Sequence, residues 1–503
     1  MARAKRFRGS ARIRGGKVAL LLAALACAVS AQPPPEAGTT APVQAPRRLI
    51  DLAARIQSRS HALAAIWPGY WPEDQAFILY DPEAGALLVS PGAHPASYAP
   101  LREADVPASL RGRLFFHRGR LPGMRRPFDI DLPIGDGRTA VIVDVSSEDI
   151  LTLLFHEQFH SFQLAAFGPA APQFVDPLAI RDRVAFAADA QVERRVLDAA
   201  LAATTEASRS RRLRQYFALR RAREASVPEA VVRVERGFER SEGVAKYVDR
   251  RAHAIFSERP TALPALLRAE LSPLVPSDST PFLTTWFRSR AYGNGAALSY
   301  LLSLYDPAGW QRAVESGGQL DLLLERRIGP IRNPGRLAAA ARAEFGHAAI
   351  AAALGPVIRA AERTEIKSVA EFLALAPVQL VVEMERTGTG FSGRALVPLS
   401  PAIVALPRAD RLASNGPGVE LAVEGRPVLL DSRGAGSTIT VLLPAPPLLD
   451  GRTAPAGERR IEGGTIRGEG LDLRLDRPAI MTVEGNRIRI RVLPLPSGGP
   501  RTR

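Results

Sequence analysis

Two histidines stand four residues apart in the segment Leu153-Leu154-Phe155-His156-Glu157-Gln158-Phe159-His160, and a glutamate follows the first of them. On a helix, side chains four residues apart lie one turn above each other, so His156 and His160 can present two imidazoles to one zinc ion. Zinc lowers the pKa of a bound water to about 7, and a carboxylate such as Glu157 can accept the proton of that water. The pattern therefore predicts metal-assisted attack on a carbonyl group.

A catalytic zinc needs a third protein ligand and keeps one position open. The metzincin arrangement would place glycine at position 163 and histidine at position 166, but the chain has Gln163 and Ala166 there, which excludes that subclass. A second segment, Ser241-Glu242-Gly243-Val244-Ala245-Lys246-Tyr247, offers a glutamate on a helical pattern.

These two segments resemble the zincin superfamily of metallopeptidases, specifically its gluzincin branch and uncharacterised exported bacterial proteins of this kind. The second segment is similar to the "Glu-Gly-x-Ala-x-Tyr" helix of several gluzincin families. The resemblance implies that His156, His160 and Glu242 bind Zn²⁺ and that Glu157 is the general base. It covers about a fifth of the chain.

Other residues compete with Glu242 for the role of third ligand. Glu242 lies 82 residues beyond His160, a longer gap than in thermolysin-like members, and the intervening helical stretch contains Glu193 and Glu206. His253 follows Glu242 by eleven residues, which is a similar helical face. Glu242 and Lys246 also have the spacing of a surface ion pair. Glu239, one turn earlier, has the spacing to orient a ligating histidine or to lie on a wet helix face.

Hydrolysis through such a site needs a hydrogen-bond donor for the developing oxyanion. We expect it in Arg290-Ala291-Tyr292-Gly293-Asn294-Gly295-Ala296, which reads as a glycine-flanked turn entering a helix over 297–305, with Tyr292 as the first candidate. The more common role of a tyrosine in such a position is to pack against a helix start. The chain has no Walker or dinucleotide fingerprint and no Gly-x-Ser-x-Gly elbow, so phosphate-loop and serine-hydrolase chemistry are not expected.

The N-terminus has the features of an export signal. Seven Lys and Arg residues precede the apolar run Val18 to Val29, and Val29-Ser30-Ala31 has the small residues of a cleavage site. We therefore predict a signal peptide over 1–31. Cys27, the one cysteine, lies within it in an imperfect lipobox, so lipid anchoring is a weaker alternative to a free periplasmic or secreted protein. Residues 32–47 read as a Pro-rich linker. No later segment has the length of a transmembrane helix.

The remaining pattern predicts an α+β protein. We expect a zincin-like catalytic domain over 48–365, with a small N-terminal β lobe (48–145) and a helical part (146–365), then a C-terminal all-β domain of sandwich or barrel type (375–503). The hairpin strands are expected at 77–80 and 86–89, a third strand at 140–145, and a capping box of Ser146 and Asp149 before the next helix. Helix breaks are expected at 169–177, 228, 273–281 and 294–295.

The composition and net charge indicate which classes of binding partner to expect. Removal of the leader reduces the net charge from +15 to +8, and the arginines are interleaved with acids without an aromatic and basic RNA-binding motif, so no nucleic-acid partner is expected. The predicted function is an exported zinc metallopeptidase that acts on a peptide or protein substrate. The alternative is a non-catalytic zinc-containing envelope binding or assembly protein with a degenerate peptidase fold. Specificity and oligomeric state are not encoded in these patterns.

Overall fold

The computed structural model describes residues 43–494 except 93, 122–127, 136–137, 147–148, 169–178, 274–285, 365, 367, 386–387, 394–396, 401, 417 and 435. The predicted signal peptide, with Cys27, and residues 32–42 of the predicted linker lie outside this range. The linker prediction is wrong for residues 43–47, because Val43 forms a parallel bridge to Leu101 and Ala45 is buried. These residues belong to the N-terminal lobe.

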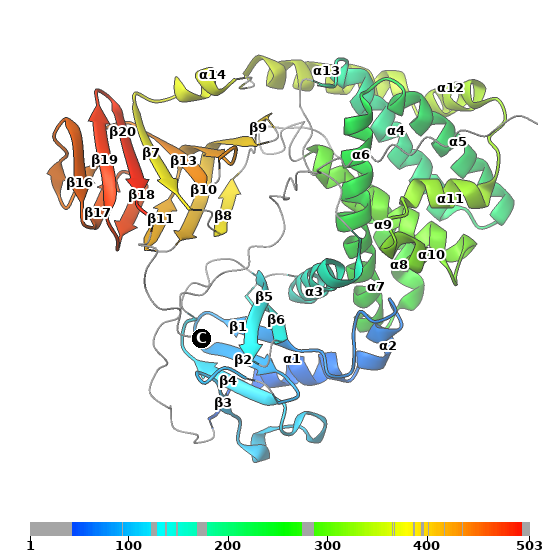
Figure 1. The fold of residues 1–503 in the computed structure, drawn as a ribbon. Coiled ribbons are helices and arrows are strands. Elements are labelled where there is room, and N and C mark those ends of the chain that lie inside the picture. Colours follow the sequence, from blue (N-terminus) through cyan, green and yellow to red (C-terminus); the bar gives the residue numbers. More distant parts are fainter. Residues whose placement is uncertain are drawn as a thin grey trace, which may run out of the picture.

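The N-terminal lobe is a six-stranded sheet preceded by two helices (Figure 1). Its elements are α1 (Arg47–Gln57), α2 (Ser60–Ala64), β1 (Phe77–Asp81), β2 (Gly85–Val89), β3 (Ala99–Pro100), β4 (Leu114–Arg118), β5 (Phe128–Gly135) and β6 (Arg138–Asp144). The expected hairpin of β1 and β2 is confirmed, with Phe77 opposite Val89. Strand β6 pairs with β1 in parallel, and β5 forms the sheet edge beside it.

Helices dominate the next two hundred residues. They are α3 (Ile150–Ala166), α4 (Arg183–Ala202), α5 (Glu206–Glu224), α6 (Glu229–Phe238), the π-helical turn η4 (Glu239–Gly243), α7 (Val244–Phe256), α8 (Leu263–Glu270), α9 (Phe287–Tyr305), α10 (Trp310–Glu315), α11 (Leu320–Ile328), α12 (Pro334–Glu344) and α13 (His347–Thr364). One face of the N-terminal sheet, including Leu79 and Val143, shares a single hydrophobic core with these helices. The sheet therefore supports α3 from one side, while the helices enclose it from the other.

The predicted helix breaks are confirmed only in part. Pro228 caps the start of α6 as expected, and the expected breaks at 169–177 and 274–281 lie outside the described residues. The break at Asn294-Gly295 is wrong, because both residues lie inside α9. The expected capping box is also wrong: Asp149 alone caps α3, accepting from the Thr152 amide at 3.3 Å, while Ser146 donates to Asp144.

Gly243 of η4 and Gly295 of α9 lie against each other where the two segments cross. This contact explains why the Asn294-Gly295 pair does not end α9. A Cβ added at Gly295 would lie 2.4 Å from the carbonyl oxygen of Glu239 and 2.7 Å from the Cα of Gly243. A Cβ added at Gly243 would lie 2.5 Å from the Cα of Gly295. Helix α9 and turn η4 thus meet backbone to backbone, and glycine is needed for this close approach rather than for a turn.

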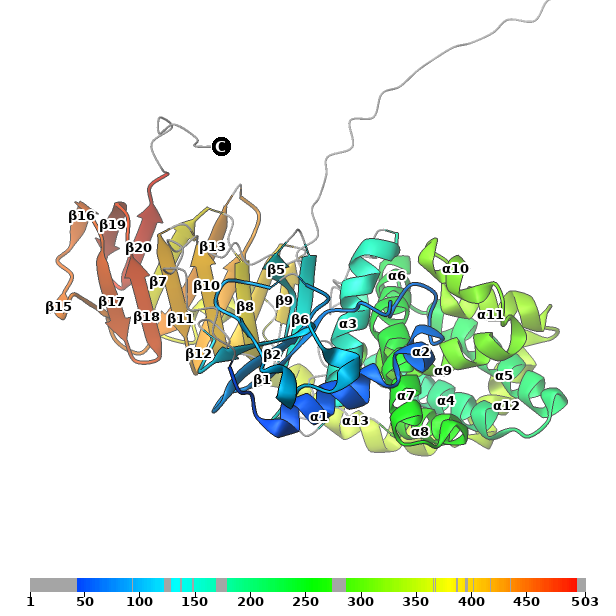
Figure 2. The same cartoon turned by 90° about the horizontal axis from the view of Figure 1, so that it is seen from below.

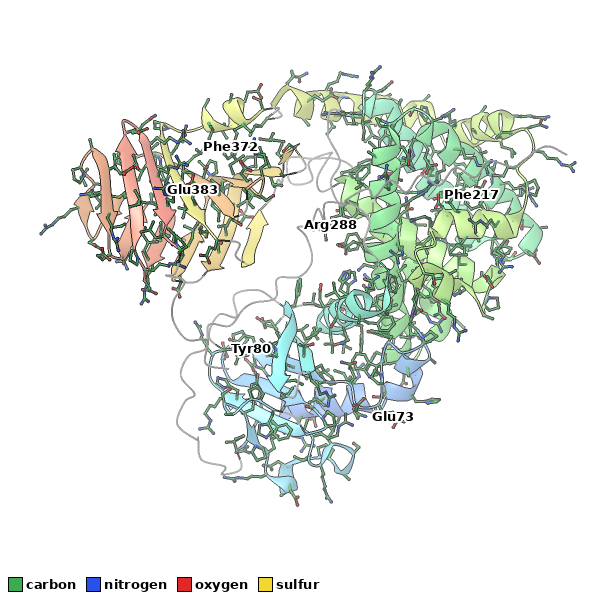
Figure 3. All side chains as sticks on the ribbon, viewed as in Figure 1. Glu73, Tyr80, Phe217, Arg288, Phe372 and Glu383 are labelled. Atoms are coloured by element: carbon green, nitrogen blue, oxygen red, sulfur yellow. The ribbon has the colours of Figure 1, made fainter. Side chains whose placement is uncertain are left out.

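The C-terminal region is built from strands that form a second sheet. They are β7 (Val378–Met384), β8 (Gly388–Gly393), β9 (Val397–Ser400), β10 (Ile403–Gly416), β11 (Val419–Val423), β12 (Arg426–Asp431), β13 (Ser437–Leu443), β14 (Leu448–Leu449), β15 (Arg452–Thr453), β16 (Gly457–Ile461), β17 (Gly464–Gly468), β18 (Leu471–Leu475), β19 (Ala479–Glu484) and β20 (Arg487–Val492). Side chains from separate parts of the strand order, such as Leu473 on β18 and Ile490 on β20, share one core. The short helix α14 (Val369–Leu373) packs Phe372 against this sheet (Figure 3).

The described chain is therefore mixed α+β, with its strands concentrated toward the C-terminus, as the sequence predicts. Figures 1 and 2 show the C-terminal strands on the opposite side of the molecule from α4, α5 and α12, and their core shares no residue with the core of the helices. Within the described part of the chain, no helix is long and apolar enough to cross a membrane.

Because Gly243 and Gly295 are in close contact, one added methyl group should lower the free energy of unfolding. Gly295→Ala should destabilise the protein by about 1–3 kcal/mol, because the new Cβ must displace backbone atoms that cannot rotate away. Gly335→Ala is the matched control, since Gly335 is also helical but a Cβ there meets nothing within 4 Å. Urea unfolding of both variants measures the difference. Equal free energies of unfolding for the two would show that the crossing is not tight.

Candidate metal centre

Helix α3 brings the two motif histidines to one side, as their spacing predicts. The opposite faces of the helix bury Leu154, Phe155 and Phe159 completely, which fixes how the helix is rotated. His156 is then 8% exposed, and the side chain of His160 is half-buried. The motif thus lies at the edge of the core rather than on an open surface.

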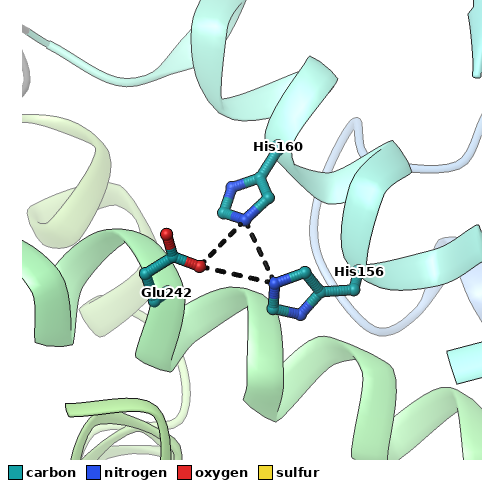
Figure 4. Close-up of side chains that lie close together, drawn as sticks. All are labelled: His156, His160 and Glu242. Atoms are coloured by element: carbon teal, nitrogen blue, oxygen red, sulfur yellow. Dashed lines mark hydrogen bonds and ion pairs between the residues drawn. The ribbon is translucent and has the colours of Figure 1, made fainter. Parts of the chain in front are cut away.

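Glu242 reaches both imidazoles from turn η4 (Figure 4). Its Oε2 lies 3.2 Å from Nε2 of His160 and 3.5 Å from Nε2 of His156, and the two Nε2 atoms are 3.1 Å apart. Among the described residues, these three form the one group of His, Cys, Asp or Glu side chains with ligand atoms close enough, all within 4.8 Å, to hold a metal ion. Two imidazole nitrogens and a carboxylate oxygen are the ligand set of many catalytic zinc sites.

The rival ligands lie elsewhere. Glu193 is fully buried against Arg223, with an Nε–Oε1 distance of 2.6 Å, and Glu206 is exposed at the start of α5. His253 lies half-buried in the last turn of α7 and is not part of the group. Glu239 does not orient a histidine either, because it accepts two hydrogen bonds from Arg220 at 2.8 and 2.9 Å.

The histidines are oriented by two residues that the sequence analysis did not select. Asp249 accepts a hydrogen bond from Nδ1 of His156 at 3.1 Å, and the Oε1 of Gln163 accepts one from Nδ1 of His160 at 2.8 Å. Each Nδ1 proton is thus donated away from Glu242. In neutral imidazoles this leaves both Nε2 lone pairs facing each other and the carboxylate, an arrangement that a bound cation stabilises.

Gln163 also connects the two halves of the centre. Its Nε2 donates to the carbonyl oxygens of Ser241 at 3.1 Å and Arg240 at 3.4 Å, both in the π-helical turn that carries Glu242. A π-turn shifts the backbone hydrogen-bond register, so it frees carbonyl groups for such a side chain. One amide therefore connects His160 to the segment that carries Glu242.

The electrostatics show that the centre attracts positive charge. Burial lowers the pKa of His156, but hydrogen bonds to Asp249 and Glu242 outweigh that effect and raise the pKa to about 9. Burial raises the pKa of Glu242, yet His160, His156 and Arg288 hold it well below its usual range. Without a metal the group binds a proton, and the donor set fits a divalent cation in the same place.

Glu157 is next to His156 in the sequence, and its pKa is shifted in the opposite direction from that of Glu242. It is 8% exposed, and burial raises its pKa, while the neighbouring imidazoles of His160 and His156 lower it in part. A raised carboxylate pKa makes a stronger base. Its position next to both ligands follows directly from the motif.

Tyr292 also lies at the centre, although its predicted turn is wrong. It projects from the interior of α9, and its ring stacks on His156 with centroids 5.8 Å apart and planes at 12°. Burial and the charge of Glu242 raise the pKa of Tyr292 well above its usual value, so its phenol stays protonated as a donor.

Arg288, one turn before Tyr292 on the same helix, pairs with Oε1 of Glu242. Its side chain is 46% exposed, and Figure 3 shows it at the margin of the helical region. The sequence analysis missed it. Spacing was the available signal for all three missed residues: Arg288 precedes Tyr292 by four, Gln163 follows His160 by three, and Asp249 follows Glu242 by seven.

Comparisons with protein-family models, curated proteins and solved structures found no match to this chain. The resemblance to gluzincins thus rests on the residues themselves and on the geometry of the centre.

The bridge through Gln163 predicts a loss of metal affinity. Gln163→Leu puts an apolar side chain of similar volume in place of the amide and removes its three hydrogen bonds, so the zinc dissociation constant should rise about 10- to 100-fold. Chelator competition measures it.

Gln158→Leu is the control, because Gln158 is equally buried on α3 but lies outside the metal-ligating group. If both variants bind zinc as tightly as the wild type, Gln163 does not position the ligands.

Proposed function

We propose that the protein is an exported, zinc-dependent hydrolase with a gluzincin-type centre, most simply a peptidase. The observation that carries the proposal is the convergence of His156, His160 and Glu242 beside the buried carboxylate of Glu157. The predicted signal peptide supports export, and the enclosure of α3 between a sheet and helices supports the zincin-like fold.

The number of ligands favours catalysis over a purely structural ion. Structural zinc sites are closed by four protein ligands, whereas catalytic sites use three. In the described part of the chain, the metal-ligating group consists of three residues. This favours the enzyme over the alternative of an envelope binding or assembly protein.

Each residue around the centre has a role in this proposal. When bound, zinc supplies a Lewis acid that polarises a carbonyl oxygen and acidifies water. Glu157 accepts the proton of the attacking water and passes it to the leaving amine. Tyr292 and Arg288, one turn apart on α9, donate hydrogen bonds to the oxygen on which negative charge develops.

Substitution of the base separates binding from chemistry. Glu157→Gln should retain zinc, because Glu157 is not a ligand, and should lower hydrolysis by at least about 100-fold. The assay incubates zinc-loaded protein with a peptide mixture that covers all residue pairs and detects new termini by mass spectrometry. A wild type that creates no new termini, or a Glu157→Gln variant with full activity, contradicts the peptidase proposal.

The third ligand is tested by metal content. Glu242→Ala should lose the bound zinc, because the two remaining imidazoles are too few to hold it tightly. Glu206→Ala is the control, since Glu206 is exposed on α5 and should keep one zinc per chain. Atomic absorption of the dialysed proteins gives the stoichiometry. Full zinc content in Glu242→Ala would mean that another residue is the ligand.

A further inference from the structure

An open cavity lies where α4, α7, α8 and α9 meet. Its volume is about 440 Å³, and its wall includes Arg194, Lys246, Glu270, Ser272, Ser289 and Tyr292. Tyr292 connects it with the metal centre, because the same ring stacks on His156. Lys246 forms a second connection, since it contacts Asp249 at 3.1 Å.

Arg194 is a buried cation that forms no ion pair with a carboxylate of the described residues. It is 3% exposed, and it donates to the carbonyl oxygens of Arg290, Glu270 and Ser272 and to the amide oxygen of Asn294, at 2.6 to 3.3 Å. None of these acceptors carries a full charge, and its Nε is enclosed without a hydrogen bond. Burial and the nearby Arg290 lower the pKa of Arg194 to about 10, and the charge of Glu270 offsets this only in part.

The other charges near the cavity cancel in pairs. Lys246 is balanced by Asp249, and Glu270 is balanced by Arg250 at 2.6 Å. Arg290, next to Arg194, is balanced by Glu235 at 2.6 Å. Among the described residues of the wall, the surplus positive charge is therefore that of Arg194. Buried charges are normally paired, so an unpaired one beside a cavity indicates a ligand of opposite charge.

We infer that this cavity binds an anion with carboxylate or phosphate oxygens, placed between Lys246 and the hydroxyl groups of Ser272 and Ser289. Such a ligand supplies the negative charge that Arg194 lacks and fills hydrogen bonds from an ammonium and two hydroxyl donors. The inference goes beyond the proposed hydrolysis and does not depend on it, because the cavity's charge is independent of the metal.

The test adds inorganic phosphate or acetate to the full-length protein at constant ionic strength. Binding should saturate at one anion per chain by calorimetry, and a tenfold excess over the dissociation constant should raise Tm by about 3 °C. Ser289→Asp places a carboxylate in the cavity, so it should weaken anion binding at least tenfold and raise Tm in anion-free buffer. Ser289→Asn adds the same bulk without charge and should bind within about threefold of the wild type.

Ser272→Asp is a second variant at an exposed position of the wall and should act like Ser289→Asp if that variant misfolds. Absence of saturable binding, or equal binding by the wild type and both aspartate variants, overturns the inference. A capped peptide that contains Glu and displaces phosphate, where its Gln counterpart does not, assigns the cavity to a substrate carboxylate. If neither peptide displaces phosphate, the ligand is a free small anion.

Discussion

The contact between Gly243 and Gly295 is the constraint on which the centre depends. It holds turn η4 against α9 without intervening side chains, so Glu242 on the turn lies beside Arg288 and Tyr292 on the helix. Larger residues would separate the two segments by the width of a side chain. The positions of Glu242, Arg288 and Tyr292 relative to one another are thus fixed by backbone atoms, which move less than side chains do.

Charge compensation explains why Glu242, rather than another buried acid of the helical region, faces the imidazoles. Glu193 and Glu235 share the buried guanidinium of Arg223 at 2.6 and 2.7 Å, and Glu239 has its own partner on α5. A buried carboxylate taken from such a pair would leave an uncompensated cation, which is costly. Glu242 instead pairs through Oε1 with the half-exposed Arg288, and its Oε2 remains for the two histidines.

Helical spacing was enough to predict which residues meet, but not how the chain holds them. His156, Glu157 and His160 share one helix, so local periodicity placed them together, and the two apolar runs on either side of the Asp81-Pro82 turn located the hairpin. The Asn294-Gly295 pair was misread, because a glycine required by a neighbouring backbone looks the same in sequence as one required by a turn. Spacing on one helix was a signal for Gln163 beside His160, but it does not show that Asp249 contacts His156 or that Gln163 contacts Ser241, because these contacts run between helical segments.

The long gap between His160 and Glu242 is compatible with a precise centre. The entropic cost of closing a loop grows by only about 0.6 kcal/mol for each doubling of its length, and here the inserted residues form α4, α5 and α6, which bury their own core. The centre instead requires that turn η4 be aligned with α3. The π-helical hydrogen-bond register of η4 allows this, because it leaves the carbonyls of Arg240 and Ser241 free to accept from Gln163. Since the same amide also contacts His160, it relates the position of His160 to that of η4 directly, whatever the length of the helices that join them.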